Sequence, residues 1–258
     1  MPKFAANLST LFTEVPLAER FKLAQEAGFT HVEVQFPYEL DIDTLKTQLD
    51  QHALQLILIN LPAGDWSAGD RGIACDPTRV AEFRAGVEQC AEYAKALGVA
   101  RVNCLSGLLP PEVDKKRAEN TLIENLRYAG SYMEERGISL LIEPINTLDV
   151  PGFFLSSMQQ AVALIERANI SNLAVQYDVY HMQIMEGNLI HTLRSHLSRV
   201  GHIQVADVPG RHEPGTGEIN FSNLFDAIDT MGYTGYVAFE YFPEKDTQSG
   251  LAKIASWR

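Results

Sequence analysis

The sequence predicts a (β/α)8 barrel, the TIM-barrel architecture, and two observations support this prediction. Eight short apolar or β-branched runs alternate with segments whose apolar residues recur at helical spacing. Eight such units in 258 residues average roughly 32 residues each, the size of one strand-and-helix repeat. An open doubly wound sheet is the alternative, but no G-x-G-x-x-G motif follows the first run, where a dinucleotide-binding fold would carry one.

The runs give the expected strands in chain order: 4–8, 31–36, 54–60, 101–105, 139–143, 173–178, 201–207 and 236–240. Helices are expected between them, for example where Leu17, Phe21 and Ala24 lie about one turn apart. Four helical segments end at a glycine, which forms a left-handed cap without steric cost: Gly28, Gly98, Gly137 and Gly232. No Pro/Gly/Ser-rich linker divides the chain, so residues 1–258 are expected to form one domain.

The composition excludes several classes of protein. With 46% hydrophobic and 21% charged residues, the chain is neither disordered nor fibrous. Its net charge of −12 repels polyanions, so we expect no nucleic-acid partner. No apolar run approaches the ~20 residues of a membrane-spanning helix and the N-terminus lacks a continuous apolar segment, which favours a cytoplasmic protein without a membrane partner. Three cysteines without C-x-x-C spacing indicate reduced thiols rather than disulfides or a zinc–thiolate site.

Three of the expected strands end in an acidic residue. Glu143, Asp178 and Glu240 each follow an apolar run, and functional side chains of this fold lie at the carboxyl ends of its strands. Three carboxylates in one low-dielectric site repel one another unless a cation neutralises them. The sequence therefore predicts a divalent metal, although each acid could instead pair with an Arg or Lys of the barrel. With the side-chain carbonyl of Gln204 as a fourth ligand, the all-oxygen set favours Mg²⁺ or Mn²⁺ over zinc.

The strand that contains Gln204 has two distinct faces. Ile203 and Val205 suit the side that packs against helices, which turns His202 and Gln204 toward the inside of the barrel. His202 is expected to fill a lower layer with its nitrogens satisfied rather than to bind metal. Asp207 is then a rim residue, either a cap or a substrate contact.

Further candidates for substrate contacts lie at strand ends and in loops. Asn60 ends the third strand. His181 follows Asp178 by three residues, so it either donates a hydrogen bond to a substrate oxygen or packs against its neighbours Tyr180 and Met182.

Two long loops, 62–77 and 209–220, are expected at the catalytic mouth. The second is rich in glycine but lacks the Gly-Lys-Ser/Thr ending of a P-loop. We interpret it as a mobile lid that brings Arg211 to an anionic substrate.

Several motifs resemble segments of hydroxypyruvate isomerases: IEPIN at 142–146, QYDVYHMQIMEGN at 176–188, GHIQVADVPGRHEPGTGEINF at 201–221 and FEY at 239–241. The opening FAANLSTLFTE and the segment NLPAGDWSAGDRGIACDP match that family as well, so the resemblance covers nearly the whole chain. Taken together, these motifs are specific for that family. Any one alone would indicate only the wider xylose isomerase-like barrel superfamily, which includes sugar epimerases and endonuclease IV.

The resemblance implies an isomerase that interconverts hydroxypyruvate and tartronate semialdehyde. The two glutamates that flank the reacting carbons in the family fall on Glu143 and Glu240, and its metal ligands fall on these two residues, Asp178 and Gln204. One glutamate would remove a proton at C3 and the other would return one at C2, through an enediolate stabilised by Mg²⁺ or Mn²⁺. Arg211, with His181, would neutralise the substrate carboxylate, and glyoxylate metabolism is the implied setting.

Other functions remain open at this stage. A 2-oxo-tetronate isomerase would use the same site on a four-carbon acid. A sugar epimerase often has histidine at the position of Gln204, and a DNA-repair endonuclease needs several zinc-binding histidines and a basic groove, so the sequence argues against both. A ligand-binding barrel without turnover is the non-enzymatic alternative. A homo-oligomer is also expected, because barrels of this size often form dimers.

Overall fold

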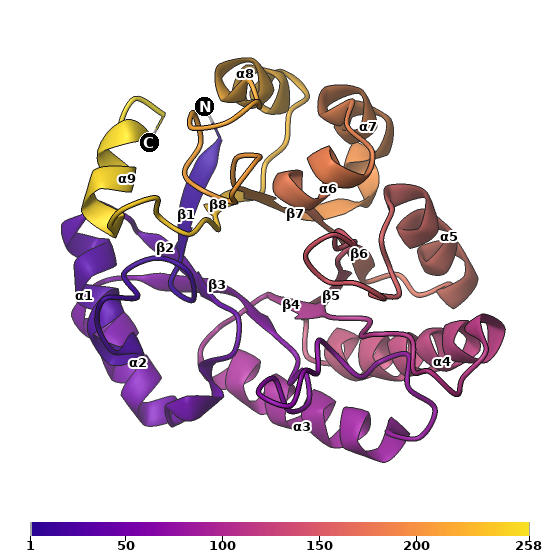
Figure 1. The fold of residues 1–258 in the computed structure, drawn as a ribbon. Coiled ribbons are helices and arrows are strands. Elements are labelled where there is room, and N and C mark those ends of the chain that lie inside the picture. The colour runs from indigo at the N-terminus through magenta and orange to yellow at the C-terminus, as the bar shows by residue number, and fades with distance from the viewer. Residues whose placement is uncertain (1, 258) are drawn as a thin grey trace.

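The computed structural model describes residues 2–257 and confirms the (β/α)8 barrel. Eight parallel strands pair in chain order, and β8 pairs with β1 to close the ring (Figure 1). The strands are β1 (Lys3–Asn7), β2 (His31–Val34), β3 (Gln55–Asn60), β4 (Arg101–Cys104), β5 (Ser139–Ile142), β6 (Leu173–Asp178), β7 (Val200–Val205) and β8 (Tyr236–Phe239). All eight predicted strands are therefore present, with ends that differ by up to two residues.

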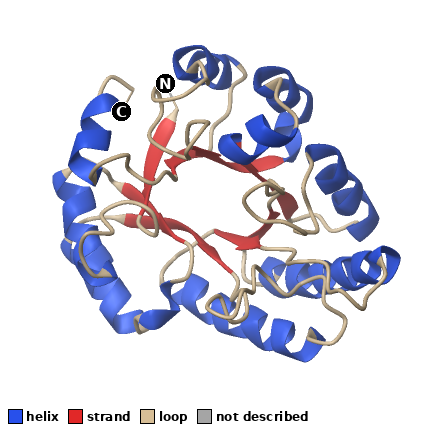
Figure 2. Ribbon diagram, viewed as in Figure 1, coloured by secondary structure: helices blue, strands red, loops and turns tan. Residues whose placement is uncertain are grey.

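Helices form a layer around the outside of the ring, as Figure 2 shows. They are α1 (Leu17–Glu26), α2 (Ile42–Gln51), α3 (Val80–Ala96), α4 (Lys115–Glu134), α5 (Met158–Ala168), α6 (Val179–Met185), α7 (Leu189–His196), α8 (Phe221–Thr230) and α9 (Thr247–Lys253), with short 3-10 helices η1 (Pro37–Glu39) and η2 (Leu197–Arg199). Within the described chain, no helix combines the length and the apolar character that crossing a bilayer requires.

Local sequence accounts for where many of these helices begin and end. The side chains of Asp41, Asp114, Ser157 and Asp246 accept hydrogen bonds from main-chain N–H groups in the first turns of α2, α4, α5 and α9. The four predicted cap glycines have φ between +69° and +90°, which confirms the left-handed caps.

The interior of the ring changes from apolar to polar along its axis. A small buried cluster consists of strand residues alone (Ala5, Ile57, Leu58, Leu141 and Ala238), so it fills the ring rather than the space beneath the helices. The polar layer is made of fully or almost fully buried side chains, among them Asn7, Glu33, Gln176, His202 and Gln204. This polar layer positions the functional site.

Two irregularities in strand pairing coincide with that polar layer. The register of β2 with β3 shifts between Val32 and Glu33, and that of β6 with β7 shifts between Val175 and Gln176. Such bulges redirect the side chain that follows them. Both Glu33 and Gln176 enter the hydrogen-bond network inside the barrel.

The three cysteines, Cys75, Cys90 and Cys104, are free and buried. Burial raises the pKa of each thiol, for Cys75 and Cys90 to about 12. They are packed thiols, as the sequence predicts.

Candidate active site

The three predicted acids meet at the carboxyl end of the barrel. Glu143 follows β5, Asp178 ends β6 and Glu240 follows β8, and their exposed fractions are 4%, 0% and 2%. Glu143 and Glu240 line one cavity of 140 Å³, together with residues from several of the loops that follow the strands. The strand-end rule therefore places both proposed proton-transfer groups on a single small chamber.

Amide side chains hold each glutamate in place. Glu143 Oε2 accepts hydrogen bonds from Asn103 Nδ2 at 2.8 Å and Gln176 Nε2 at 2.9 Å. Glu240 Oε2 accepts from Asn7 Nδ2 at 2.7 Å and from Gln204 Nε2. Each carboxylate thus has one oxygen fixed from within the barrel, and the other oxygen of Glu240 accepts from Gln35 Nε2 at 3.0 Å and from Arg211.

Gln204 points inward, as the two faces of its strand predict. Its Nε2 donates to Glu33 Oε1 at 2.6 Å and to Glu240, while its Oε1 accepts from Gln176 Nε2 at 2.7 Å. Because Gln176 also donates to Glu143, two amides connect the two glutamates in a continuous chain of hydrogen bonds.

Beneath this chain lies a buried pair that the sequence analysis missed. His202 Nε2 is 2.6 Å from Glu33 Oε2, and neither side chain is exposed. His202 therefore lies in a lower layer, as predicted, with Nε2 satisfied. Its Nδ1 has no hydrogen-bond partner among the residues described. A glutamate inside a parallel strand, between Val32 and Val34, is the signal that could have revealed Glu33, since such strands are buried on both faces.

Arg211 is already bound to two of the acids. Its Nη2 lies 2.6 Å from Glu240 Oε1 and 3.3 Å from Asp178 Oδ2, and its guanidinium stands 5.2 Å from the centre of the Tyr180 ring. Its Nε is buried and has no partner in the described part of the chain, so this donor is available to a ligand in the cavity.

The loop that carries Arg211 is anchored, which differs from the mobile lid that we expected. Asp207 accepts hydrogen bonds from the main-chain N–H groups of Val208, Gly215, Gly217 and Ile219. The main-chain oxygen of Arg211 accepts from Phe242 N at 2.8 Å. Of the two roles predicted for Asp207, these contacts favour the cap.

His181 presents a hydrogen-bond donor to the site. The Oδ1 of Asn146 accepts from main-chain N–H groups of Leu148 and Asp149, so its Nδ2 is the atom 2.7 Å from His181 Nδ1. His181 Nδ1 must then accept, which puts the ring proton on Nε2. Burial, with a smaller contribution from Arg211, lowers the pKa of His181 well below its usual value, so the ring is neutral.

That Nε2–H group lies 3.4 Å from Asp178 Oδ2 and 4.0 Å from Glu143 Oε1, and His181 lines the cavity. The structure thus gives the geometry for donation to a substrate oxygen. The ring also contacts Tyr180 edge to face, with centroids 5.3 Å apart, so both sequence interpretations of His181 describe part of its environment.

Asn60, the last residue of β3, lines the same cavity. Its main-chain oxygen accepts from the hydroxyl of Tyr38, whereas its side-chain Oδ1 is buried and finds no partner within residues 2–257. An unpaired buried acceptor is costly unless a ligand supplies a donor.

The acids of the site resist ionisation. Burial raises the pKa of Glu143 to about 8, and the nearby Asp178 adds to the effect. Burial also raises the pKa of Asp178, and raises that of Glu240 well above its usual value, although Arg211 opposes both shifts. One guanidinium therefore does not compensate three buried carboxylates.

This surplus of negative charge fits a divalent cation. Glu143, Asp178 and His181 each have one potential ligand atom within 4.8 Å of the others. His181 is poorly suited as a ligand, because its Nε2 carries the proton. The suitable donors are the carboxylate oxygens and Gln204 Oε1, whose second lone pair is free beyond the bond from Gln176. Such hard oxygen donors suit Mg²⁺ or Mn²⁺.

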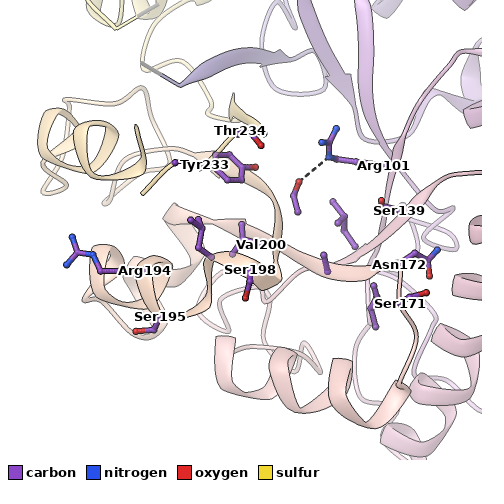
Figure 3. A pocket seen from close by; sticks show the side chains of 17 residues that line it. Arg101, Ser139, Ser171, Asn172, Arg194, Ser195, Ser198, Val200, Tyr233 and Thr234 are labelled. Atoms are coloured by element: carbon purple, nitrogen blue, oxygen red, sulfur yellow. Dashed lines mark hydrogen bonds between the residues drawn. The ribbon is translucent and has the colours of Figure 1, made fainter. Parts of the chain in front are cut away.

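A larger cavity of 730 Å³ lies at the opposite end of the barrel, where β4 to β7 begin. Figure 3 shows its lining, with Arg101 hydrogen-bonded to the main-chain oxygen of Gly201. Its lining contains serines and two arginines but no Asp, Glu, His or Cys. It therefore offers no carboxylate, imidazole or thiol for proton transfer.

Comparisons with known proteins identify the family of this chain. The family model described as Xylose isomerase-like TIM barrel matches residues 21–257. The hydroxypyruvate isomerase of Escherichia coli K12 is 48% identical over the full length of both chains. The 2-oxo-tetronate isomerase of Cupriavidus necator is 43% identical over 97% of this chain and 96% of its own.

Solved structures show the same fold. The crystal structure of a family 2 AP endonuclease from Brucella melitensis superimposes with a TM-score of 0.97 and 46% identity, and covers both chains completely. The 3-keto-D-glucoside 4-epimerase of Escherichia coli has a TM-score of 0.81 at 20% identity over 99% of this chain and 98% of its own, which shows a shared fold alone. The chain belongs to the xylose isomerase-like TIM barrel family and is an isomerase related to the hydroxypyruvate and 2-oxo-tetronate isomerases.

Proposed function

We propose that the protein interconverts hydroxypyruvate and tartronate semialdehyde, with Glu143 and Glu240 as the two proton-transfer groups. The observation that carries this proposal is the single cavity that both carboxylates line. Its volume of 140 Å³ is well below the roughly 300–1,000 Å³ of sites for drug-sized ligands, so it suits a three-carbon acid. The full-length relationship to an enzyme named for this substrate supports the same choice.

The reaction needs a base at one carbon and an acid at the next. One glutamate removes a proton from C3 to give an enediolate across C2 and C3, the proton of the C3 hydroxyl moves to the C2 oxygen, and the other glutamate delivers a proton to C2. The amide donors of Asn103 and Gln176 on Glu143, and of Asn7 and Gln204 on Glu240, fix both carboxylates during this transfer.

Three further residues would orient the substrate. The Nε2–H group of neutral His181 donates to the substrate oxygen that becomes negative in the enediolate. The unpaired Oδ1 of Asn60 accepts from a substrate hydroxyl, and the unpaired Nε of Arg211 donates to a substrate oxygen. These roles would satisfy buried polar atoms that otherwise lack partners.

We also propose that Glu143, Asp178, Gln204 and Glu240 hold a Mg²⁺ or Mn²⁺ ion. The support is the buried charge: three carboxylates with raised pKa values face one arginine. When bound, such an ion polarises a carbonyl and lowers the pKa of its carboxylate ligands.

A second candidate is 2-oxo-tetronate isomerisation, which the 43% identical relative favours. A nuclease activity has less support. The one cluster of potential ligands among the described residues contains a single histidine, whereas a multi-zinc nuclease needs several.

We further propose that residues 1–258 act as one domain in the cytoplasm, on three-carbon acids of glyoxylate metabolism. The pairing of β8 with β1 supports the single domain. A homo-oligomer remains a prediction.

The test is proton NMR of purified protein with hydroxypyruvate and, separately, with 2-oxo-tetronate, each with added Mg²⁺ or Mn²⁺ and again after chelation. We expect hydroxypyruvate to show the higher kcat/KM and chelation to abolish turnover. Preference for the four-carbon acid would move the assignment to the second candidate. Binding of either acid without exchange of its C–H protons would indicate a barrel without turnover.

A further inference from the structure

One arginine at the cavity has no carboxylate partner. Arg71 lines the same chamber as Glu143 and Glu240, yet within residues 2–257 it forms no ion pair. Its Nη1 donates only to main-chain oxygens, of Trp66 at 3.1 Å and of Asp70 at 2.7 Å. A guanidinium has five N–H donors, so most of those of Arg71 remain for a ligand.

An aromatic ring supports this guanidinium from one side. The Cζ atom of Arg71 lies 4.0 Å from the centre of the Trp66 ring, and that ring lies 5.4 Å from the ring of Phe36, which also lines the cavity. Stacking on a flat face restrains the guanidinium and leaves its edge for a planar, bidentate partner.

Contacts on both sides of Arg71 hold its loop in place. Before it, the carboxylate of Asp70 accepts hydrogen bonds from Asp65 N and Arg79 Nη1, both at 2.7 Å. After it, Gly72 has φ +104°, and a Cβ atom there would approach the main-chain oxygen of Leu105 to 2.5 Å. Only glycine fits that position. A cation held in place before the ligand arrives loses little freedom on binding.

The acidic lining of the cavity favours such a cation. Glu143, Glu240 and Asp149 line it in a protein with a net charge of −12, and whatever negative charge these acids carry repels an anionic substrate. Arg211 cannot fully offset them, because its guanidinium already contacts Glu240 and Asp178.

We propose that Arg71 binds the carboxylate of the substrate and thereby makes the enzyme selective for an oxo acid over an uncharged sugar of the same length. This inference rests on the proposed isomerisation of hydroxypyruvate. Arg71 takes no part in proton transfer, so its loss affects KM rather than kcat.

The experiment compares wild type, Arg71→Met and Arg71→Lys with two compounds. Hydroxypyruvate is the substrate, and dihydroxyacetone, in which a CH₂OH group replaces the carboxylate, is the competitive inhibitor. In Arg71→Met we expect the KM for hydroxypyruvate to rise about 10- to 100-fold while kcat stays within about threefold, since a hydrogen bond to a charged group is lost. The inhibition constant of dihydroxyacetone should not change. Arg71→Lys keeps the positive charge but lacks the planar, bidentate N–H donors of a guanidinium, so it should give an intermediate KM for hydroxypyruvate.

Arg84→Met is the matched control. Arg84 also stacks on an aromatic ring, at 4.8 Å from the centre of Tyr128, but it is exposed on α3 and does not line the cavity. Its removal should leave both constants unchanged.

The outcomes separate this inference from the proposed function. If wild type isomerises hydroxypyruvate and Arg71→Met keeps the wild-type KM, the function stands and the inference is overturned. Equal weakening of hydroxypyruvate and dihydroxyacetone would also overturn it, because Arg71 would then only support the loop. If wild type converts neither oxo acid, the proposed function itself fails.

Discussion

The two ends of the barrel differ in what their cavities contain. The amino-terminal cavity is about five times larger, at 730 Å³ against 140 Å³, and its lining has no carboxylic acid or histidine. The carboxyl-terminal cavity is small, and it has two glutamates, a neutral histidine and two arginines in its wall. Convergence of perturbed ionisable groups, rather than cavity volume, is the basis on which we propose the carboxyl end as the functional end.

The difference also has an energetic side. Burial raises the pKa of all three acids at the carboxyl end, which means that ionising them there costs stability. At the amino end, exposed polar residues such as Arg194 and Ser198 remain accessible to water. Substitutions should therefore have large effects at one end and small effects at the other.

The largest effect is expected from the proton-transfer groups. Glu143→Gln and Glu240→Gln keep the shape of the side chain but remove its ability to exchange a proton. We expect each to lower kcat by about 10²- to 10⁴-fold, the usual contribution of a positioned acid or base. Steady-state kinetics would measure this effect, with circular dichroism as the control for folding. Near wild-type turnover in either variant would contradict the two-glutamate mechanism.

A smaller but still substantial effect is expected beneath the site. Glu33→Gln replaces the carboxylate that contacts His202 Nε2 and Gln204 Nε2 with an amide. Because a buried hydrogen-bonding group that loses its partner typically costs about 1–3 kcal/mol, we expect a comparable loss in the free energy of unfolding, measured by urea denaturation. A loss below about 0.5 kcal/mol, the range of ordinary surface substitutions, would show that this pair does not stabilise the barrel.

Metal addition should stabilise the protein in a pH-dependent way. The pKa of Glu143 is about 8 in the folded protein, against an ordinary value of 4.5. Without metal, the proton that Glu143 retains stabilises the fold fully below pH 4.5, and this contribution disappears as the pH rises through 8. A cation replaces that proton, so the increase in Tm with Mn²⁺ should be larger at pH 8 than at pH 6.

The size of this metal effect follows from binding. When the free metal concentration is a hundred times its Kd, binding raises the free energy of unfolding by about 2.7 kcal/mol. Differential scanning calorimetry at both pH values would measure it, with the chelated protein as reference. An equal increase at both pH values would indicate an ion bound elsewhere.

The smallest effect is expected at the amino end. Arg194→Ala removes an exposed arginine that borders the larger cavity. Neither kcat nor KM for hydroxypyruvate should change beyond experimental error, and stability should stay within about 0.5 kcal/mol. A clear loss of activity would show that this cavity contributes to the reaction.

The sequence predicts the fold and the acids well because both follow simple periodic rules. Apolar runs ending in a carboxylate locate Glu143, Asp178 and Glu240, and the alternation along β7 correctly turns Gln204 inward. Strand-end position is enough to predict that these acids meet at one end of the barrel.

Residues that are positioned by irregular backbone cannot be predicted from strand-end position or alternation. Glu33 and Gln176 follow register shifts that no periodic pattern reveals. Arg71 lies in a long loop whose path depends on the close approach of Gly72 to Leu105, a tertiary contact. The pairing of Arg211 with Asp178 and Glu240 likewise depends on how two distant segments meet.

The central claim is that Glu143 and Glu240 transfer protons, and isotope incorporation tests it most directly. Hydroxypyruvate is incubated with enzyme and Mg²⁺ in D₂O, and deuterium at C2 of tartronate semialdehyde is followed directly by NMR at early times against an enzyme-free exchange control. The account predicts solvent deuterium at C2 in wild type and no product in Glu143→Gln or Glu240→Gln. A product whose C2 hydrogen comes from C3 without solvent deuterium would reveal a hydride shift and would contradict the account.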